Sequence, residues 1–187
     1  ASAARDVGEL MGIEGNAREV YYGAWNSVLP DDIRYSGRTR RPPRSRLDAL
    51  MSLGNSLLYA AVLDEIHKTH VDPRIGYLHS TNSRKFSLNL DISDIFKPAL
   101  VDRAIFSLVN RSALGEEDFS SDLRGILLSD SGRRKFISEF DSHMESTVMH
   151  RGLGRKVSYR ELVRIEVYKI ERHLIEGTPY EPFSMRG

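Results

Sequence analysis

Residues 45–66 read SRLDALMSLGNSLLYAAVLDEI, and this run indicates how the whole chain is built. Its apolar residues recur at three- and four-residue steps and cover much of the circumference of a helix. They are Leu47, Leu50, Met51, Leu57, Leu58, Ala61, Val62 and Ile66. Ser45 with Asp48 three residues later can cap the start of this helix. A helix that is apolar on most sides is buried, so we expect a long central helix with other helices packed around it.

The flanking sequence predicts those other helices. Helical apolar spacing extends over residues 1–28, resumes from Phe86, and recurs near 133–149. A capping box at Ser158–Glu161 starts a last helix, which Gly177 ends. Pro98 should kink or divide the helix that contains it. Strand-like alternation is sparse, and we therefore expect an all-α fold, a multi-helix catalytic bundle that forms one domain over residues 1–187.

Composition excludes several classes of protein. The 187 residues are 40% hydrophobic, which is enough for one substantial core, and the net charge is only +1. The absence of cysteine excludes disulfides and thiolate metal sites. No window approaches the roughly 18 apolar residues of a membrane span, so we expect a protein that does not enter membranes. The chain starts at Ala1 without an initiator Met, and we interpret it as a fragment of a longer chain.

A strongly basic segment precedes the central helix. Between residues 34 and 46 there are six arginines, two consecutive prolines and no acidic residue, a composition typical of an extended loop. The arginines are Arg34, Arg38, Arg40, Arg41, Arg44 and Arg46. Such a segment binds backbone phosphates with little sequence preference. The alternative is a solvated loop without a ligand.

Four residues are candidates for a metal site. Asp91 and Asp94 share one face of a helix, where their mutual repulsion favours a bound cation, unless Asp91 caps the helix and Asp94 faces solvent. His79 is a ligand or a packed histidine. Glu14 stands near two glycines that indicate a ligand or close helix approach, unless it pairs with Arg18 at i, i+4. Carboxylates with one imidazole suit Mn²⁺ or Mg²⁺ better than structural zinc.

Three ordered segments carry a resemblance to a known family. They are EGNAREVYY at 14–22, RRPP at 40–43 with ALMSLGNSLLY at 49–59, and DPRIGYLH at 72–79 with FSLNLDISDIFKP at 86–98. Together they resemble the spacer-acquisition integrase, the larger of the two universal CRISPR adaptation proteins, over about residues 9–183. Asp48 departs from the family's usual asparagine, and Asp94 stands where glutamate is common. Nothing at the start of this sequence resembles the small β-rich N-terminal domain of the family.

The resemblance implies both a site and a reaction. It implies Glu14, His79 and Asp94 as metal ligands, and Asp91 as a neighbouring carboxylate that orients them or holds a second ion. Arg18 and the arginines of the basic segment would contact DNA. The family joins the 3′ hydroxyls of a double-stranded prespacer to the boundaries of CRISPR repeat DNA by transesterification. It acts as a homodimer with a small ferredoxin-like partner protein in the prokaryotic cytoplasm.

Three alternative interpretations of the sequence remain open. A metal-dependent nuclease that cuts branched DNA needs the same ligands and differs only in using water as the nucleophile. A non-catalytic DNA-binding or scaffolding fragment would keep the acidic cluster without chemistry. A helical interaction module with no nucleic-acid role would place Glu14, His79 and Asp94 in separate surroundings, because metal ligands must lie near 2 Å from one ion.

Overall fold

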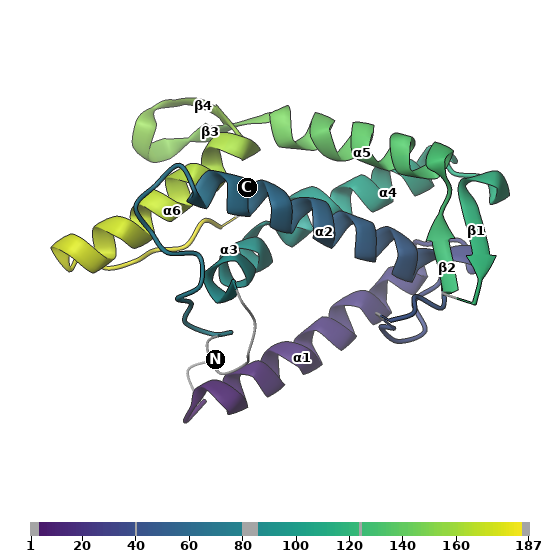
Figure 1. Cartoon of the computed structure of the whole chain (residues 1–187), viewed down its shortest axis with the longest axis horizontal. Coiled ribbons are helices and arrows are strands. Elements are labelled where there is room, and N and C mark those ends of the chain that lie inside the picture. The colour runs from purple at the N-terminus through teal and green to yellow at the C-terminus, as the bar shows by residue number, and fades with distance from the viewer. Residues whose placement is uncertain (1–3, 40, 80–85, 124, 185–187) are drawn as a thin grey trace.

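The computed structural model describes residues 4–39, 41–79, 86–123 and 125–184, and most of these are helical, as predicted (Figure 1). The helices are α1 Val7–Ala24, α2 Arg46–Ile66, α3 Ser87–Lys97, α4 Arg103–Asn110, α5 Asp130–Glu145 and α6 Tyr159–Glu176. Two short antiparallel sheets accompany them. They consist of β1 Phe119–Asp122 with β2 Gly125–Leu128, and of β3 Thr147–His150 with β4 Arg155–Ser158.

Helix α2 is the centre of the hydrophobic core, which confirms the prediction from its sequence. Leu50, Leu58 and Val62 are fully buried, and α3, α5 and α6 all pack against the helix (Figure 1). The hydroxyl of Ser45 accepts a hydrogen bond of 3.0 Å from the backbone N–H of Asp48, so the predicted cap is formed.

Helix α1 lies apart from the other helices and crosses below them in Figure 1. None of its residues is buried, but in the turn that follows it Trp25 is buried, with its ring 4.5 Å from that of Phe106. Within the helix, Arg18 pairs with Asp94 and Tyr21 donates to Asp102. The helix is shorter than the predicted 1–28. It starts at Val7 because the side chain of Asp6 caps it by accepting from the N–H of Glu9, and a 3₁₀ turn replaces its last residues.

Pro98 divides a helical segment, as predicted. Between α3 and α4 the chain forms one π-helical segment, Pro98–Asp102, whose wider turn relieves the clash of the proline ring with the preceding turn. The residues of this segment that follow the proline are buried in the core. The chain therefore stays helical from α3 into α4.

The prediction of a helix near 133–149 was wrong at its end. Helix α5 stops at Glu145, Ser146 is extended, and Thr147–His150 is strand β3. The hydrogen bonds that replace the helical ones come from β4, and Gly154 supplies the left-handed residue of the connection at φ 62°. Both hairpins were missed because strands of four residues carry too little alternation to be recognised.

The C-terminal tail is anchored by two aromatic residues. The hydroxyl of Tyr180 donates to Oε1 of buried Glu166 at 2.5 Å, and the same oxygen accepts from the N–H of Phe183 at 3.0 Å. The Phe183 ring stacks on Phe96 of α3 with centroids 5.5 Å apart. The tail therefore supports α3.

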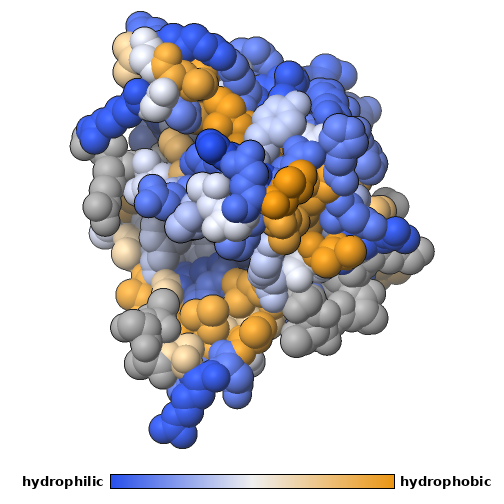
Figure 2. Space-filling view, turned by 90° about the vertical axis from the view of Figure 1, so that its left-hand side faces the viewer, coloured by the Kyte–Doolittle hydropathy of each residue, from blue (hydrophilic) through white to orange (hydrophobic). Residues whose placement is uncertain are grey.

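No helix in the part of the chain that the structure describes combines the length and apolarity needed to cross a bilayer. On the face seen in Figure 2, hydrophobic side chains form separate patches between hydrophilic ones.

The close packing around Gly54 gives a test of this core. A Cβ atom at Gly54 would lie 2.6 Å from Cγ1 of Val101 and 3.0 Å from Cζ of Phe136. We expect Gly54→Ala to destabilise the protein by about 1–3 kcal/mol through overpacking, although alanine favours helix by about 1 kcal/mol. Urea unfolding measures the difference. Gly12→Ala in α1, where a Cβ meets nothing within 4 Å, should stabilise; destabilisation by both changes would contradict the packing argument.

Candidate metal centre

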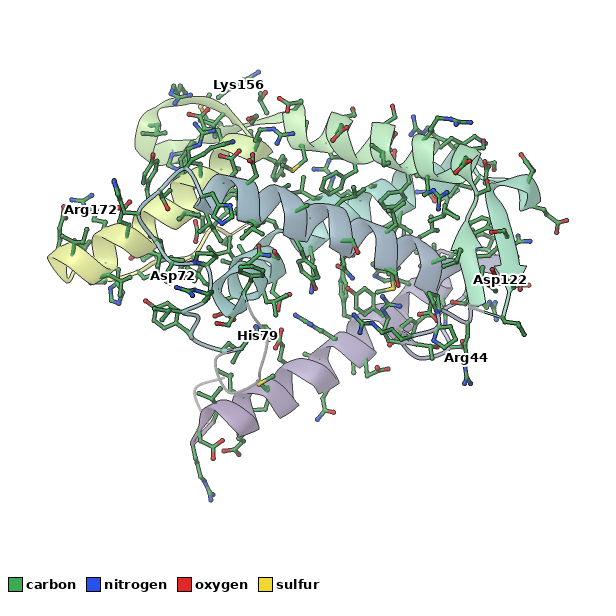
Figure 3. All side chains as sticks on the ribbon, in the orientation of Figure 1. Arg44, Asp72, His79, Asp122, Lys156 and Arg172 are labelled. Atoms are coloured by element: carbon green, nitrogen blue, oxygen red, sulfur yellow. The ribbon has the colours of Figure 1, made fainter. Side chains whose placement is uncertain are left out.

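Three separate elements bring the predicted ligands together. Glu14 comes from α1, His79 from the segment before α3, and Asp94 from α3. One ligand atom of each lies within 4.8 Å of the others, and Figure 3 shows His79 between α1 and α3. His79 is buried, and the two carboxylates are partly exposed. This convergence argues against the interaction module, which requires separate surroundings for the three residues.

Asp91 holds the segment that carries His79. Its carboxylate accepts from the backbone N–H groups of Tyr77 at 2.6 Å, Leu78 at 3.1 Å and His79 at 3.1 Å. The same carboxylate lies 2.6 Å from Nδ1 of His79. With Nδ1 donating to Asp91, Nε2 is left as the atom that can bind a metal, and it faces Asp94 at 3.8 Å.

The alternative in which Asp91 caps α3 was therefore wrong. Helix α3 begins at Ser87, and its N-cap residue, Phe86, makes no side-chain capping bond. The carboxylate of Asp91 instead satisfies backbone donors of another segment, which is the orienting role that the resemblance offered as one of two possibilities.

Two cations balance the acidic pair. The guanidinium of Arg18 lies between Oε1 of Glu14 and Oδ2 of Asp94, the latter at 2.6 Å, and Lys97 approaches the other oxygen of Asp94. Burial raises the pKa of Asp94, but the charges of Lys97 and Arg18 outweigh it and hold that pKa below its usual value. Burial also acts to lower the pKa of Arg18, and the charges of Asp94 and Glu14 more than compensate.

The i, i+4 pair of Glu14 with Arg18 is thus present, and it occurs together with the proposed ligand set. Close helix approach was the wrong reason for the neighbouring glycines, because a Cβ at Gly12 or Gly15 would meet nothing within 4 Å.

The donor set fits a hard divalent cation, since two carboxylates and an imidazole are its ordinary ligands. Ligand atoms around one ion are up to about 4.2 Å apart, so only a small inward shift is needed.

Buried Asp48 organises the basic segment, residues 34–46. Its Oδ1 accepts from Nη1 of Arg38 at 2.9 Å and from the N–H of Thr39 at 3.2 Å, and its Oδ2 accepts from the N–H of Arg44 at 3.4 Å. The charge of the Asp48 carboxylate balances that of Arg38. Asp48 therefore fixes the course of the segment as well as the start of α2.

The predicted DNA-binding arginines differ in how far they are already engaged. Arg34 pairs with Asp31, and Arg46 pairs with Asp32 and Glu116. Within the described residues, Arg41 and Arg44 have no ion pair, and Arg40 lies outside those residues. Figure 3 labels Arg44 near the C-terminal end of α1, away from His79. Contact of these arginines with DNA stays a prediction.

A hollow of about 240 Å³ opens over the metal centre, and it contains residues that the sequence did not single out. They are Tyr22, Asn55, Tyr59 and Lys97. Only Lys97 had a local signal, since it lies three residues after Asp94 on the same helix. The others approach from α1 and α2, and only the tertiary fold brings them to the site.

Asp102 is a buried carboxylate close to this region. It accepts a hydrogen bond of 3.0 Å from the hydroxyl of Tyr21, and its other oxygen has no partner among the described residues. Burial raises the pKa of Asp102 to about 7, although the hydrogen bond from Tyr21 opposes the shift. The fold therefore favours the neutral carboxyl.

Comparisons with known proteins agree with one another. The family model described as CRISPR associated protein Cas1 matches residues 1–142. A CRISPR-associated endonuclease Cas1 of Thermodesulfovibrio yellowstonii is 50% identical over 176 residues, which are 94% of this chain and 53% of the relative. The chain thus spans about half the length of the curated relatives that it matches.

Solved structures share the fold. A Cas1 protein from Thermotoga maritima superposes with a TM-score of 0.85 at 48% identity, covering 93% of this chain and 54% of that one. A casposase bound to an integration product superposes with a TM-score of 0.86, covering 95% of this chain and 53% of that one. At 23% identity the casposase is evidence for the fold alone.

We expect Asp91→Asn to weaken Mn²⁺ binding about 10–100-fold, because outer partners that orient a ligating histidine typically have effects of this size. Isothermal titration with MnCl₂ measures the affinity. Asp72→Asn is the matched control, since Asp72 is a partly exposed carboxylate near the start of the same segment and pairs with Arg74. Equal losses in both variants would show that Asp91 has no specific role.

Asp102 should make stability depend on pH. Because its pKa is raised in the fold, its contribution is fully present below the unfolded value and is lost as pH rises through about 7. Asp102→Asn keeps an acceptor for Tyr21 and cannot ionise. We expect the variant to match the parent at pH 4 and to exceed its unfolding free energy above pH 8 by on the order of 2–4 kcal/mol. Denaturant unfolding at both pH values tests this, with exposed Asp141→Asn as the control; parallel profiles for parent and Asp102→Asn would contradict it.

Proposed function

The chain belongs to the Cas1 family, and on that premise we propose that it is the helical catalytic domain, residues 1–187, of a CRISPR spacer-acquisition integrase. The proposed reaction joins prespacer 3′ hydroxyls to repeat boundaries by transesterification. The observation that carries the proposal is the convergence of Glu14, His79 and Asp94 from three elements within 4.8 Å. Names of the relatives support endonuclease chemistry, and the casposase that shares this fold is bound to an integration product.

In this proposal Glu14, His79 and Asp94 would hold Mn²⁺ or Mg²⁺, which supplies Lewis-acid polarisation of the phosphate. Asp91 fixes the imidazole so that Nε2 points into the site. Arg18 and Lys97 already lie against the acidic pair, where they are placed to stabilise negative charge that develops on a phosphodiester. No side chain has to become covalently attached to the DNA.

The substrates proposed are a double-stranded prespacer and CRISPR repeat DNA, with Arg18 and the basic segment as contacts to the phosphates. Arg41 and Arg44 are the strongest candidates, because the other described arginines of the segment already pair with acidic residues. By the resemblance, a homodimer would act with a small ferredoxin-like partner protein in the prokaryotic cytoplasm. These assemblies are part of the proposal, because the chain spans about half the length of the curated relatives that it matches.

Two other functions use the same geometry. A nuclease would cut branched DNA with water as the nucleophile, and the word endonuclease in the names of relatives favours it. A scaffolding fragment would bind DNA without chemistry. The three functions differ in their products, and one assay separates them.

We expect the protein to join a labelled prespacer to a repeat-containing plasmid in the presence of Mn²⁺ and not in EDTA. The variant His79→Ala should reduce joining at least 100-fold, because the substitution removes a proposed metal ligand. Strand-transfer products on a denaturing gel give the measurement. His70→Ala is the control, because the His70 side chain is exposed and pairs with Glu171 outside the centre.

Metal-dependent cutting without joining would replace the integrase by the nuclease. Binding of DNA without joining or cutting would support the scaffolding fragment. Full activity of His79→Ala would remove the metal centre from the proposal altogether.

A further inference from the structure

Two cations lie between the metal centre and buried Asp102. Arg18 contacts Asp94 at 2.6 Å, and one turn further along α1 Tyr21 donates to Asp102 at 3.0 Å. The two contacting elements therefore carry an acid, a cation and the Tyr21–Asp102 pair in the same order. On α1 the residues are Glu14, Arg18 and Tyr21, and on the continuous helical segment 87–102 they are Asp94, Lys97 and Asp102.

Asp102 has an unused position for a cation. It is only 2% exposed, its Oδ2 accepts from Tyr21, and its Oδ1 has no hydrogen-bond partner among the residues that the structure describes. A buried polar atom without a partner destabilises a protein, so its retention calls for an explanation. The charges of Lys97 and Arg18 both act on Asp102, but neither side chain forms an ion pair with it.

Arg18 is the cation that loses its partners when a metal ion binds. Its guanidinium contacts Glu14 and Asp94, and both carboxylates belong to the proposed ligand set. Lys97 differs, because it also lies 5.3 Å from the centre of the Tyr59 ring and keeps that contact. The metal ion would therefore displace the guanidinium of Arg18 first.

The displaced guanidinium is within reach of Asp102. Arg18 and Tyr21 are three residues apart on α1, and side chains at this spacing are neighbours with about 5–6 Å between their Cβ atoms. The hydroxyl of Tyr21 is already bonded to Asp102. Since the guanidinium is carried on a flexible stem of methylene groups, a turn of that stem suffices and the helix need not move.

We propose that Asp102 receives the guanidinium of Arg18 when a divalent cation occupies the metal centre, and that its carboxyl group gives up a proton in this exchange. The ion takes the carboxylates of Glu14 and Asp94, the guanidinium pairs with Oδ1 of Asp102, and the proton passes to solvent. The inference rests on the proposed function for the presence of the ion. It adds that metal binding and protonation are coupled through a residue that is not a ligand.

The groups that act on Asp102 identify it as the source of the proton. Burial raises the pKa values of Tyr21 and Tyr22, so both hydroxyls keep their protons near neutral pH. Burial acts to lower the pKa of Arg18, but its acidic neighbours raise it further, and Lys97 of α3 already pairs with Asp94. Burial raises the pKa of Asp102 to about 7, against the bond from Tyr21, so about half of the molecules carry this proton at pH 7.

The test counts the protons released when Mn²⁺ binds. Titration calorimetry at pH 7 in buffers of different ionisation enthalpy gives this number. We expect the parent to release about half a proton more per ion than Asp102→Asn, and the difference to vanish at pH 8.5. Protons lost by the metal ligands are common to both proteins and cancel. Between pH 6 and 8 the Mn²⁺ affinity of the parent should rise about tenfold more than that of the variant.

Arg18→Gln separates transfer of the guanidinium from the electric field of the ion. The Arg18 side chain is 32% exposed, so the substitution leaves the core intact. We expect this variant to bind Mn²⁺ at least as tightly as the parent, because the competing cation is gone, and to release as few protons as Asp102→Asn. Release equal to that of the parent would mean that the field of the ion alone acts on Asp102, and it would overturn the inference.

Asp118→Asn is the matched control. Asp118 is also buried with one unpaired oxygen among the described residues, but Lys135 already pairs with it at 2.6 Å. We expect Asp118→Asn to release as many protons as the parent. A reduced release in this variant too would show that any buried carboxylate has the effect, and it would contradict a specific role of Asp102.

The outcomes separate this inference from the proposed function. If Mn²⁺ binds but the parent and Asp102→Asn release equal numbers of protons, the inference alone is wrong. If release depends on Asp102 and Arg18 but the parent shows no strand transfer, the inference stands and the catalytic proposal is wrong. If the parent binds no Mn²⁺, both the metal centre and the inference are wrong.

Discussion

The carboxylate of Asp91 is the interaction on which the rest of the site depends. Three consecutive backbone N–H groups and the imidazole of His79 all converge on it. Without it, an irregular segment rich in unpaired donors would have to place a histidine with the precision that metal ligation needs. Asp91 and Asp94 differ by less than one helical turn, so the residue that positions the imidazole and the residue that would share its ion move as one rigid unit.

Charge balance is the second constraint. Glu14 and Asp94 would repel each other at this distance, and the positive charges of Arg18 and Lys97 offset that repulsion. A metal cation held by Glu14 and Asp94 would compete with Arg18 for these two carboxylates. Metal affinity and the position of Arg18 are therefore linked, because the guanidinium has to give up contacts that the ion replaces.

The sequence predicted features that depend on residues three or four positions apart, but it did not predict contacts between segments that are distant in the chain. The burial of α2, its cap at Ser45 and the shared face of Asp91 and Asp94 follow from spacings of three and four residues. The bonds from Asp91 to residues 77–79 span 12–14 positions, and no periodicity encodes them. Tyr59, likewise, lies 35 positions from Asp94. The four-residue strands were not predicted for another reason: they are stabilised by pairing with a neighbouring strand, and their own composition does not indicate that pairing.

Helix α1 carries Glu14, a proposed metal ligand, and yet buries none of its residues; the buried Trp25 directly follows its C-terminal end. Regions with few buried contacts open at a lower free energy than the core, so α1 is expected to detach locally while α2 and α6 stay folded. An ion held jointly by Glu14, His79 and Asp94 would link that helix to the rest of the molecule. Hydrogen exchange along α1 would then slow when metal binds, and the site would become a regulator of local order as well as a centre of chemistry.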